Sequence, residues 1–216
     1  YLIGIDLGTS GTKTVLFDEN AGTVAAHSME YPLYQPYNGW AEQDPDDWWK
    51  AVVGTINAVI EKSHISSSQI AGIGISGQMH GLVMVDQDGN SLGRAILWCD
   101  GRTSEECREI MERIGQNRLI EISANPALTG FTAGKILWVR KHESEKYKKC
   151  KKILLPKDYI RYRLTGVYAT EVSDASGTNL FDVPRRCWSK EILDGLEIEE
   201  DILPMVMESC QISGRV

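Results

Sequence analysis

The chain opens with alternating apolar and polar segments that are typical of β-strands. The apolar run Leu2 to Leu7 leads through the small and polar residues Gly8 to Lys13 into a second extended run, Thr14 to Phe17. This spacing predicts two strands joined by a tight turn. A further stretch, Thr23 to Met29, predicts a third antiparallel strand, so the fold is expected to start with a three-stranded meander.

A helix is predicted directly after this meander. Asp44 is a suitable N-cap, and Pro45 fits the first helical position, where no backbone donor is needed. Apolar residues then recur with helical spacing, at Trp49, Val52, Val53, Ile56 and Ile60. This spacing predicts that one face of the helix packs on the sheet.

The remaining chain alternates between short apolar strands and helical segments, which favours an α/β fold. The predicted strands are Ile70 to Ser76, Leu82 to Val85, Ala95 to Trp98 and Ile153 to Pro156. The predicted helices follow a capping box at Thr103 to Glu106, or cover Gly134 to His142, Asp158 to Leu164 and the residues after Ser189. We find no internal repeat or linker, so one domain is expected over residues 1–216.

The turn between the first two strands has the chemistry of a phosphate site. Gly8 and Gly11 permit backbone angles with positive φ that would direct N–H groups into one concavity. The turn also offers the hydroxyls of Thr9, Ser10 and Thr12 and the cation of Lys13. Asp6, at the end of the first strand, could hold Mg²⁺ directly or through water. The alternative is a surface hairpin without a ligand. The pattern is not a Walker loop.

Polar side chains follow the strand Ile70 to Ser76. Strand ends in open α/β sheets are where ligands usually bind, so Gln78 and His80 are candidates for hydrogen bonds to a polyhydroxylated substrate, with Met79 beside its apolar side. The alternative for His80 is a buried histidine whose hydrogen bonds are satisfied by the protein.

A second group of polar residues follows the strand Ala95 to Trp98. The face of Trp98 could stack on sugar carbons, and Asp100 and Arg102 could bond hydroxyl groups. The alternative is an ion pair between Asp100 and Arg102 that only braces a loop. Another small polar segment, Ser173 to Thr178, either cradles a ligand group or makes a turn, and its composition favours the turn.

Composition narrows the function classes. A net charge of -7 argues against non-specific binding of nucleic acid, which needs a basic face. No apolar run is long enough to span a membrane, and the first strand leaves no room for a secretory leader, so a cytoplasmic location is expected. The five cysteines are widely spaced and are expected to be reduced thiols.

Six segments together resemble the amino-terminal half of the FGGY carbohydrate kinases over nearly the whole chain. These are Asp6 to Lys13, Trp40 to Pro45, Ser76 to Gly81, Ile96 to Arg102, Leu154 to Tyr159 and Ser173 to Thr178. The form Gln-Met-His-Gly at Gln78 to Gly81 resembles the xylulose kinases in particular, with gluconate kinases as close relatives.

The resemblance implies a ribonuclease H-like domain of the actin, hexokinase and Hsp70 type, with a mixed sheet and flanking helices, that forms one wall of a cleft. It implies ATP and Mg²⁺ as cofactors and conversion of D-xylulose to D-xylulose 5-phosphate. Asp6 would orient the metal, Gly8 to Lys13 would meet the transferred phosphate, and Met79 and His80 would touch the sugar. The residue types of Trp98 and Asp100 also suit a sugar-binding cleft.

One part of the family pattern lies outside this chain. In the family, the general base is an Asp in a Gly-Gly-Asp-Asn-like segment, and that segment and the adenosine pocket belong to the carboxy-terminal domain. The chain alone is therefore expected to hold half an active site and to be inactive. A second hypothesis is a non-catalytic domain that binds sugar weakly or serves assembly. The oligomeric state stays open, with a homodimer as one option.

Overall fold

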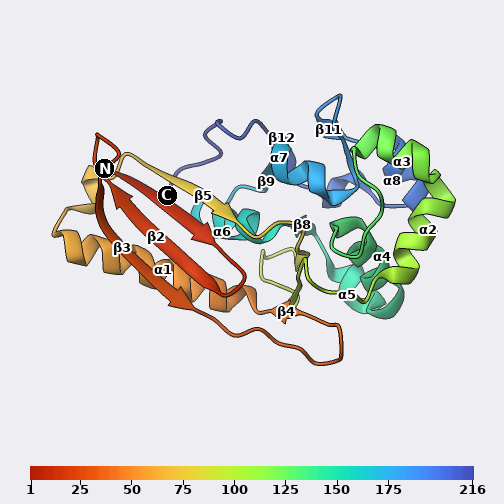
Figure 1. The fold of residues 1–216 in the computed structure, drawn as a ribbon, viewed down its shortest axis with the longest axis horizontal. Helices are drawn as coiled ribbons and strands as arrows, with labels where there is room; N and C mark the ends of the chain where they lie inside the picture. The colour runs from red at the N-terminus through yellow and green to blue at the C-terminus, as the bar shows by residue number, and fades with distance from the viewer.

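A computed structural model describes all residues, 1–216, and its central feature is a four-stranded mixed sheet (Figure 1). The strands are β1 (Leu2–Leu7), β2 (Gly11–Phe17), β3 (Thr23–Glu30) and β5 (Gly72–Gly77), in the order β3-β2-β1-β5. The first three strands form the predicted antiparallel meander, and β5 pairs with β1 in parallel. The chain also contains eight α-helices, of which α1 and α6 share a core with this sheet, and the prediction of an α/β fold with a mixed sheet and flanking helices is confirmed.

The two faces of this sheet differ in character. One face buries the apolar residues Ile3, Ile5, Leu7 and Leu16 in a core that also contains residues of α1 (Pro45–Ser63) and α6 (Pro156–Thr165). The other face carries residues that alternate with these, and Leu2, Asp6 and Lys13 are exposed on it. Because side chains alternate along a strand, every second residue of the hairpin is directed to this open face.

Helix α1 begins as predicted, but its packed face is shifted. Asp44 caps the helix by accepting a hydrogen bond from the backbone N–H of Asp46 at 2.9 Å. Of the five residues predicted for the packed face, only Val52 is buried. The buried residues are Pro45, Trp48, Ala51, Val52, Thr55 and Val59. Trp49 and Ile56 are partly buried and pack against the same core, so the predicted face is confirmed in part. The prediction left out Thr55, whose hydroxyl lies 2.7 Å from that of buried Thr14.

A small two-stranded sheet lies between the two hydrophobic cores of the chain. Strands β6 (Val83–Val85) and β8 (Lys152–Leu154) pair antiparallel, and alternate residues of β6 face different cores. Leu82, Met84 and Ile153 belong to the core that is built mainly from helices, whereas Val83, Val85 and Leu154 belong to the core beneath the large sheet. A continuous apolar run is what a strand buried on both faces requires.

The helical core is built from α2 (Ser104–Ile114), α3 (Gln116–Ser123), α4 (Thr132–His142) and α8 (Lys190–Leu196). Ser189 caps α8 as predicted, since its hydroxyl accepts a hydrogen bond from Ile192 N–H at 3.3 Å. The capping box at Thr103 is not formed. The Thr103 hydroxyl is directed to the Thr129 carbonyl instead, at 3.4 Å.

The other elements are short. They are β4 (Glu42–Gln43), β7 (Ala95–Ile96), α5 (Ser144–Lys149), β9 (Ala169–Glu171), α7 (Val172–Ala175), β10 (Phe181–Asp182), β11 (Cys187–Trp188), β12 (Met205–Met207) and 3₁₀ turns at Ser67–Gln69, Ser176–Thr178 and Glu200–Ile202. The segment predicted as a loop or turn at 173–178 is thus mostly helical. All five cysteines are free, as expected.

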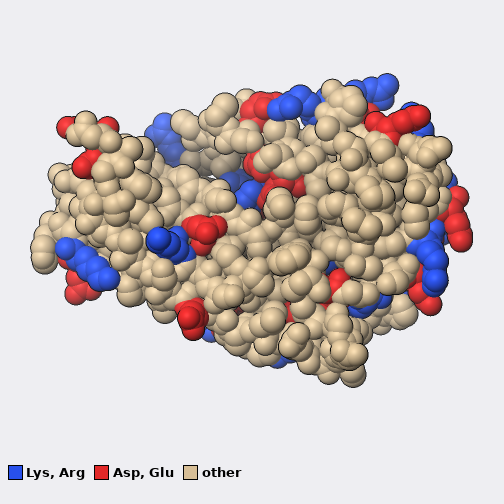
Figure 2. Space-filling view, viewed as in Figure 1, with Lys and Arg blue, Asp and Glu red and all other residues tan.

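The helices and one face of the surface bear on the expectations for a membrane span and for a basic area. None of the helices combines the length and the apolar character that crossing a membrane would require. Figure 2 shows basic and acidic side chains in mixed groups over one face, with no broad basic area on it. This distribution agrees with the net charge of -7.

Candidate functional site

Two of the predicted loops leave the sheet side by side. In the parallel pair of β1 and β5, Leu7 lies opposite Gly77, and the N–H of Gln78 donates to the Leu7 carbonyl at 2.7 Å. The next residues along the two strands begin the hairpin at Gly8 and the loop Gln78 to Gly81. Adjacent carboxyl ends of parallel strands are a common place for ligands in α/β proteins.

The hairpin turn is closed by a backbone hydrogen bond from Gly8 N–H to the Gly11 carbonyl at 3.0 Å. The expectation that Gly8 and Gly11 adopt positive φ is wrong, since neither lies in that region. Glycine is needed at position 11 because a Cβ there would lie 2.6 Å from the carbonyl oxygen of Met29 on the neighbouring strand. The small side chains therefore allow close packing of strands at the tip.

The hydroxyl groups of the hairpin have different surroundings. Thr12 is buried, and its hydroxyl donates to the Asp6 carbonyl at 3.0 Å, so the expectation that this hydroxyl faces a phosphate is wrong. Thr9 accepts a hydrogen bond from the Trp98 indole N–H at 3.0 Å. Ser10 and Lys13 are exposed. The groups of the hairpin that remain open to an anion are thus the backbone at the tip, Ser10 and Lys13.

Asp6 and Lys13 lie opposite each other on the open face of the sheet. The Asp6 carboxylate is exposed and makes no hydrogen bond or ion pair. The structure has no group of three or more His, Cys, Asp or Glu side chains that could hold a metal ion. A single free carboxylate fits Mg²⁺ only where water and phosphate oxygens supply the other ligands, which is how Mg²⁺ is usually bound in phosphoryl-transfer sites.

Gln43 connects the two loops, a role that the sequence pattern did not reveal. Its Nε2 donates to the Thr9 carbonyl at 2.6 Å, and its Oε1 accepts from Gln78 Nε2 at 2.9 Å and from Trp48 Nε1 at 3.0 Å. Gln43 itself is buried. In the sequence, the feature that could have pointed to Gln43 was its position in the motif Trp40 to Pro45. Gln78 is left with a buried Oε1 that has no partner.

His80 is held in an unusual conformation next to this bridge. Its φ is 63°, and its half-buried ring packs edge to face on Phe131 with centroids 4.7 Å apart. Nδ1 is buried and has no hydrogen-bond partner. Burial lowers the pKa of His80, the Lys135 cation lowers it further, and the nearby Gly177 backbone acts in the opposite direction. Met79, beside it, is about half exposed.

Trp98 and Asp100 end up in different environments. Trp98 is about half exposed beside the hairpin. Asp100 is 1 % exposed, and both of its oxygens bind Arg102, with side-chain distances of 2.9 and 2.7 Å, while Oδ2 also accepts from Ala41 N–H at 2.6 Å. The Arg102 guanidinium stacks on Trp40, 3.5 Å from the ring centroid. The predicted alternative of an ion pair that braces the loop is therefore what the structure contains.

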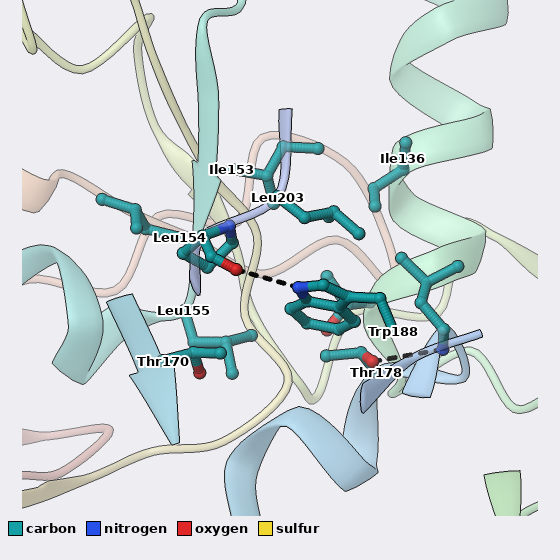
Figure 3. Close-up of a pocket in the computed structure, with 11 residues that line it drawn as sticks. Ile136, Ile153, Leu154, Leu155, Thr170, Thr178, Trp188 and Leu203 are labelled. Atoms are coloured by element: carbon teal, nitrogen blue, oxygen red, sulfur yellow. Dashed lines mark hydrogen bonds between the residues drawn. The ribbon is translucent and has the colours of Figure 1, made fainter. Parts of the chain in front are cut away.

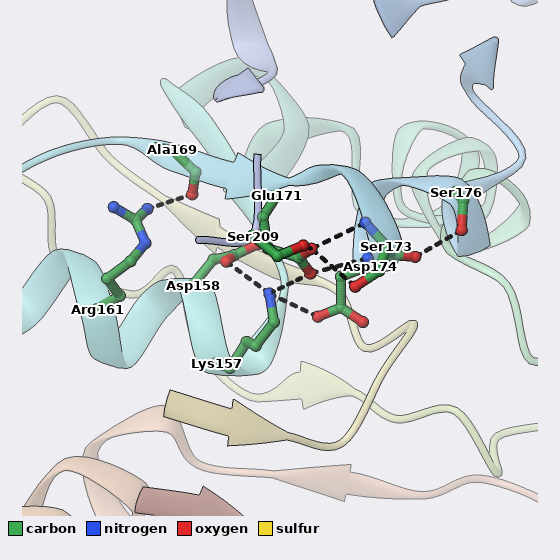
Figure 4. A network of polar contacts seen from close by, with 9 residues as sticks. All are labelled: Lys157, Asp158, Arg161, Ala169, Glu171, Ser173, Asp174, Ser176 and Ser209. Carbon is green, nitrogen blue, oxygen red and sulfur yellow. Dashed lines mark hydrogen bonds and ion pairs between the residues drawn. The ribbon is translucent and has the colours of Figure 1, made fainter. Parts of the chain in front are cut away.

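A buried ionic network joins residues of α6, β9 and α7 (Figure 4). The Lys157 ammonium contacts Asp158 at 3.0 Å, Asp174 at 2.8 Å and Glu171 at 3.3 Å. Burial raises the pKa of Glu171, but hydrogen bonds from Ser209 and Ser173 and the Lys157 charge outweigh it and hold the pKa at about 2. The network ties α6 to β9 and α7, and we interpret it as structural.

A small apolar cavity lies in the helical core (Figure 3). Its lining includes Ile136, Leu154, Thr170 and Trp188, and the Trp188 indole N–H is bonded to the Pro204 carbonyl at 2.8 Å. The space holds about one water molecule. A sugar needs more room and more polar partners, so this cavity is not the substrate site.

Comparisons with known proteins agree with this geometry. The family model for the FGGY family of carbohydrate kinases, N-terminal domain, matches residues 1–216. The xylulose kinase of Bacillus subtilis is 46% identical over 214 residues, which cover 99% of this chain and 43% of that protein. The chain thus spans less than half the length of this relative.

Solved structures share the fold. A ligand-bound xylulose kinase from Lactobacillus acidophilus superposes with a TM-score of 0.89 at 33% identity, over 96% of this chain and 42% of that one. A gluconate kinase from the same organism superposes with a TM-score of 0.88 at 32% sequence identity, over 95% of this chain and 41% of that one. The expected fold of the actin, hexokinase and Hsp70 type is confirmed. With its matched motifs, sheet order and paired loops, the chain belongs to the FGGY family of carbohydrate kinases, as an amino-terminal domain.

Proposed function

We propose that this chain is the sugar-binding wall of an ATP-dependent pentulose kinase that converts D-xylulose to D-xylulose 5-phosphate. The observation that carries the proposal is the pairing of the hairpin 8–11 with the loop 78–81 at the ends of two parallel strands, with Gln43 bonded to both. A kinase must hold a phosphate and a hydroxyl side by side, and this arrangement places the candidate groups for each in neighbouring loops.

On the phosphate side, the backbone of Gly8 to Gly11 with Ser10 and Lys13 would meet the transferred phosphoryl group. The free carboxylate of Asp6 would hold Mg²⁺ through a bridging water molecule. When bound with the nucleotide, the metal neutralises charge on the phosphate oxygens. Thr12 contributes by bonding the Asp6 carbonyl, which fixes the strand end.

On the sugar side, Gln78 Oε1 and His80 Nδ1 are buried polar atoms that have no hydrogen-bond partner in the protein. Met79 and Trp98 supply exposed apolar surface beside them. These groups suit a substrate that alternates hydroxyl groups with C–H faces. Asp100 acts indirectly in this proposal, since Arg102 and the Ala41 N–H already occupy its oxygens.

The proposed reaction needs a carboxylate that accepts the proton of the sugar hydroxyl. Asp6 is assigned to the metal, and Asp100 is paired with Arg102. We propose that the base and the adenosine pocket come from a carboxy-terminal domain. Residues 1–216 would then act as one domain, built around the small sheet of β6 and β8. The enzyme would work in the cytoplasm, where ATP is available.

The first test compares this chain with a longer polypeptide that also contains the second domain, in a coupled assay for ADP with D-xylulose and Mg-ATP. We expect the 216-residue chain to melt cooperatively in circular dichroism but to release no sugar-dependent ADP. Sugar-dependent ADP release by the chain alone, above a heat-killed control, would contradict the assignment of the base to a second domain.

The second test is His80→Ala in the longer polypeptide. We expect the KM for the sugar to rise about tenfold or more, because a lost hydrogen bond at a buried polar site costs about 1–3 kcal/mol. The KM for ATP should stay nearly unchanged. His142→Ala, at an exposed histidine that stacks on Trp138, is the matched control and should change neither value. A rise in the KM for ATP instead would show that the loop is misassigned.

A further inference from the structure

Lys135 is a fully buried cation directly behind the candidate sugar loop. It lies in α4, its exposed fraction is 0 %, and it makes no ion pair within 4.0 Å. Its ammonium donates to the carbonyls of His80 at 3.1 Å, Phe131 at 3.1 Å and Gly130. Burying an unpaired charge is costly unless hydrogen bonds replace its hydration, and three carbonyls fill the three donor positions of an ammonium.

Three other residues near Lys135 also hold His80 in place. The Thr132 hydroxyl donates to the same His80 carbonyl at 3.2 Å. The Phe131 ring contacts the imidazole, and a Cβ at Gly177 would collide with it on another side. A histidine with a φ of 63° is in a sparsely populated region and persists only where its surroundings hold it there.

We propose that Lys135 is a positioning residue that holds His80 in the conformation in which its imidazole meets the substrate. The proposal rests on the sugar-binding role of His80 proposed above. Lys135 itself is buried beneath the loop and does not touch the substrate. It acts by fixing the His80 carbonyl relative to α4, so that the side chain is directed between Phe131 and Gly177 before the sugar arrives.

The charge of Lys135 also affects the imidazole. Burial lowers the pKa of Lys135 to about 7, with Asp100, Cys107 and Cys99 opposing this shift and Arg102 adding to it. While Lys135 is protonated, its charge helps to keep His80 neutral. A neutral imidazole has one donor and one acceptor nitrogen, which suits a hydroxyl group. Removal of the cation is therefore expected to raise the pKa of His80.

The test is Lys135→Met, which keeps the length and removes the charge and the donors. In the 216-residue chain, NMR of ¹³C-labelled histidine should show a shifted His80 ring resonance and a higher His80 pKa than in the wild type. In the longer polypeptide, the KM for the sugar should rise about tenfold, with the KM for ATP unchanged. Lys148→Met, at an exposed site where Lys148 pairs with Glu145, is the control and should leave both readouts unchanged.

Thr132→Val provides a milder variant that removes one donor to the same carbonyl. It should shift the His80 resonance and raise the sugar KM by a smaller factor, and it decides the question if Lys135→Met does not fold. Unchanged His80 resonance and sugar KM in the folded variant would overturn the proposal. The His80 signals could change in these variants while His80→Ala leaves the sugar KM unaltered. That result would support the positioning of His80 by Lys135 and would contradict the proposed sugar-binding role of His80.

Discussion

Asp6→Asn is expected to lower kcat of the longer polypeptide by about 100-fold or more while the KM for the sugar changes little. Asn keeps the size of the side chain but removes its negative charge. Asp6 is exposed on the open face of the sheet and has no protein partner, so the substitution should disturb neither the fold nor the neighbouring side chains. The loss arises because a Mg²⁺ contact is needed mainly when the phosphoryl group is transferred.

The measurement is a coupled assay at saturating sugar and ATP, with the Mg²⁺ concentration varied. Asp88→Asn is the matched control, since this exposed aspartate lies in a distant turn and should leave kcat unchanged. Asp6→Asn should also need more Mg²⁺ for half-maximal rate. An unchanged kcat at saturating substrates would remove Asp6 from the mechanism.

Asp100→Ala is expected to lower the free energy of unfolding of the 216-residue chain by about 3–5 kcal/mol. The substitution leaves the Arg102 guanidinium buried without its bidentate partner, because only 2 % of that side chain is exposed. It also removes the acceptor of the Ala41 N–H. Glu42 still contacts Arg102 at 2.8 Å, but from one side only.

Urea denaturation followed by circular dichroism measures this effect. Glu105→Ala is the control, because Glu105 pairs with Arg108 at 3.7 Å on the surface and such pairs contribute about 0–1 kcal/mol. A loss below about 1 kcal/mol for Asp100→Ala would show that the buried pair is not a main support of this loop.

The local features of the fold could be read from the sequence because their causes are local. The hairpin 2–17 and the N-cap at Asp44 depend on residues within a few positions of each other. The packed face of α1 could not be predicted in the same way. It includes Thr55, which meets Thr14 of a distant strand, a contact that hydrophobic spacing does not encode.

The candidate site was predicted in its parts but not in its connections. Motifs identified the hairpin and the loop 78–81, whereas Gln43 and Lys135 became apparent only where the chain brings distant segments together. A buried polar residue in a strand or helix looks like any surface residue in the sequence. Its burial and its partners are properties of the fold. For the same reason, the sequence alone allowed Asp100 to be either a substrate ligand or a member of a structural ion pair.

The proposed function is tested most directly by the sugar preference of the longer polypeptide. A coupled assay with Mg-ATP compares D-xylulose, ribulose, gluconate and glycerol under identical conditions. Our account predicts the highest kcat/KM for D-xylulose, by about tenfold or more over each of the others. A preference for gluconate or another of these sugars, or no ADP release with any of them, would contradict it.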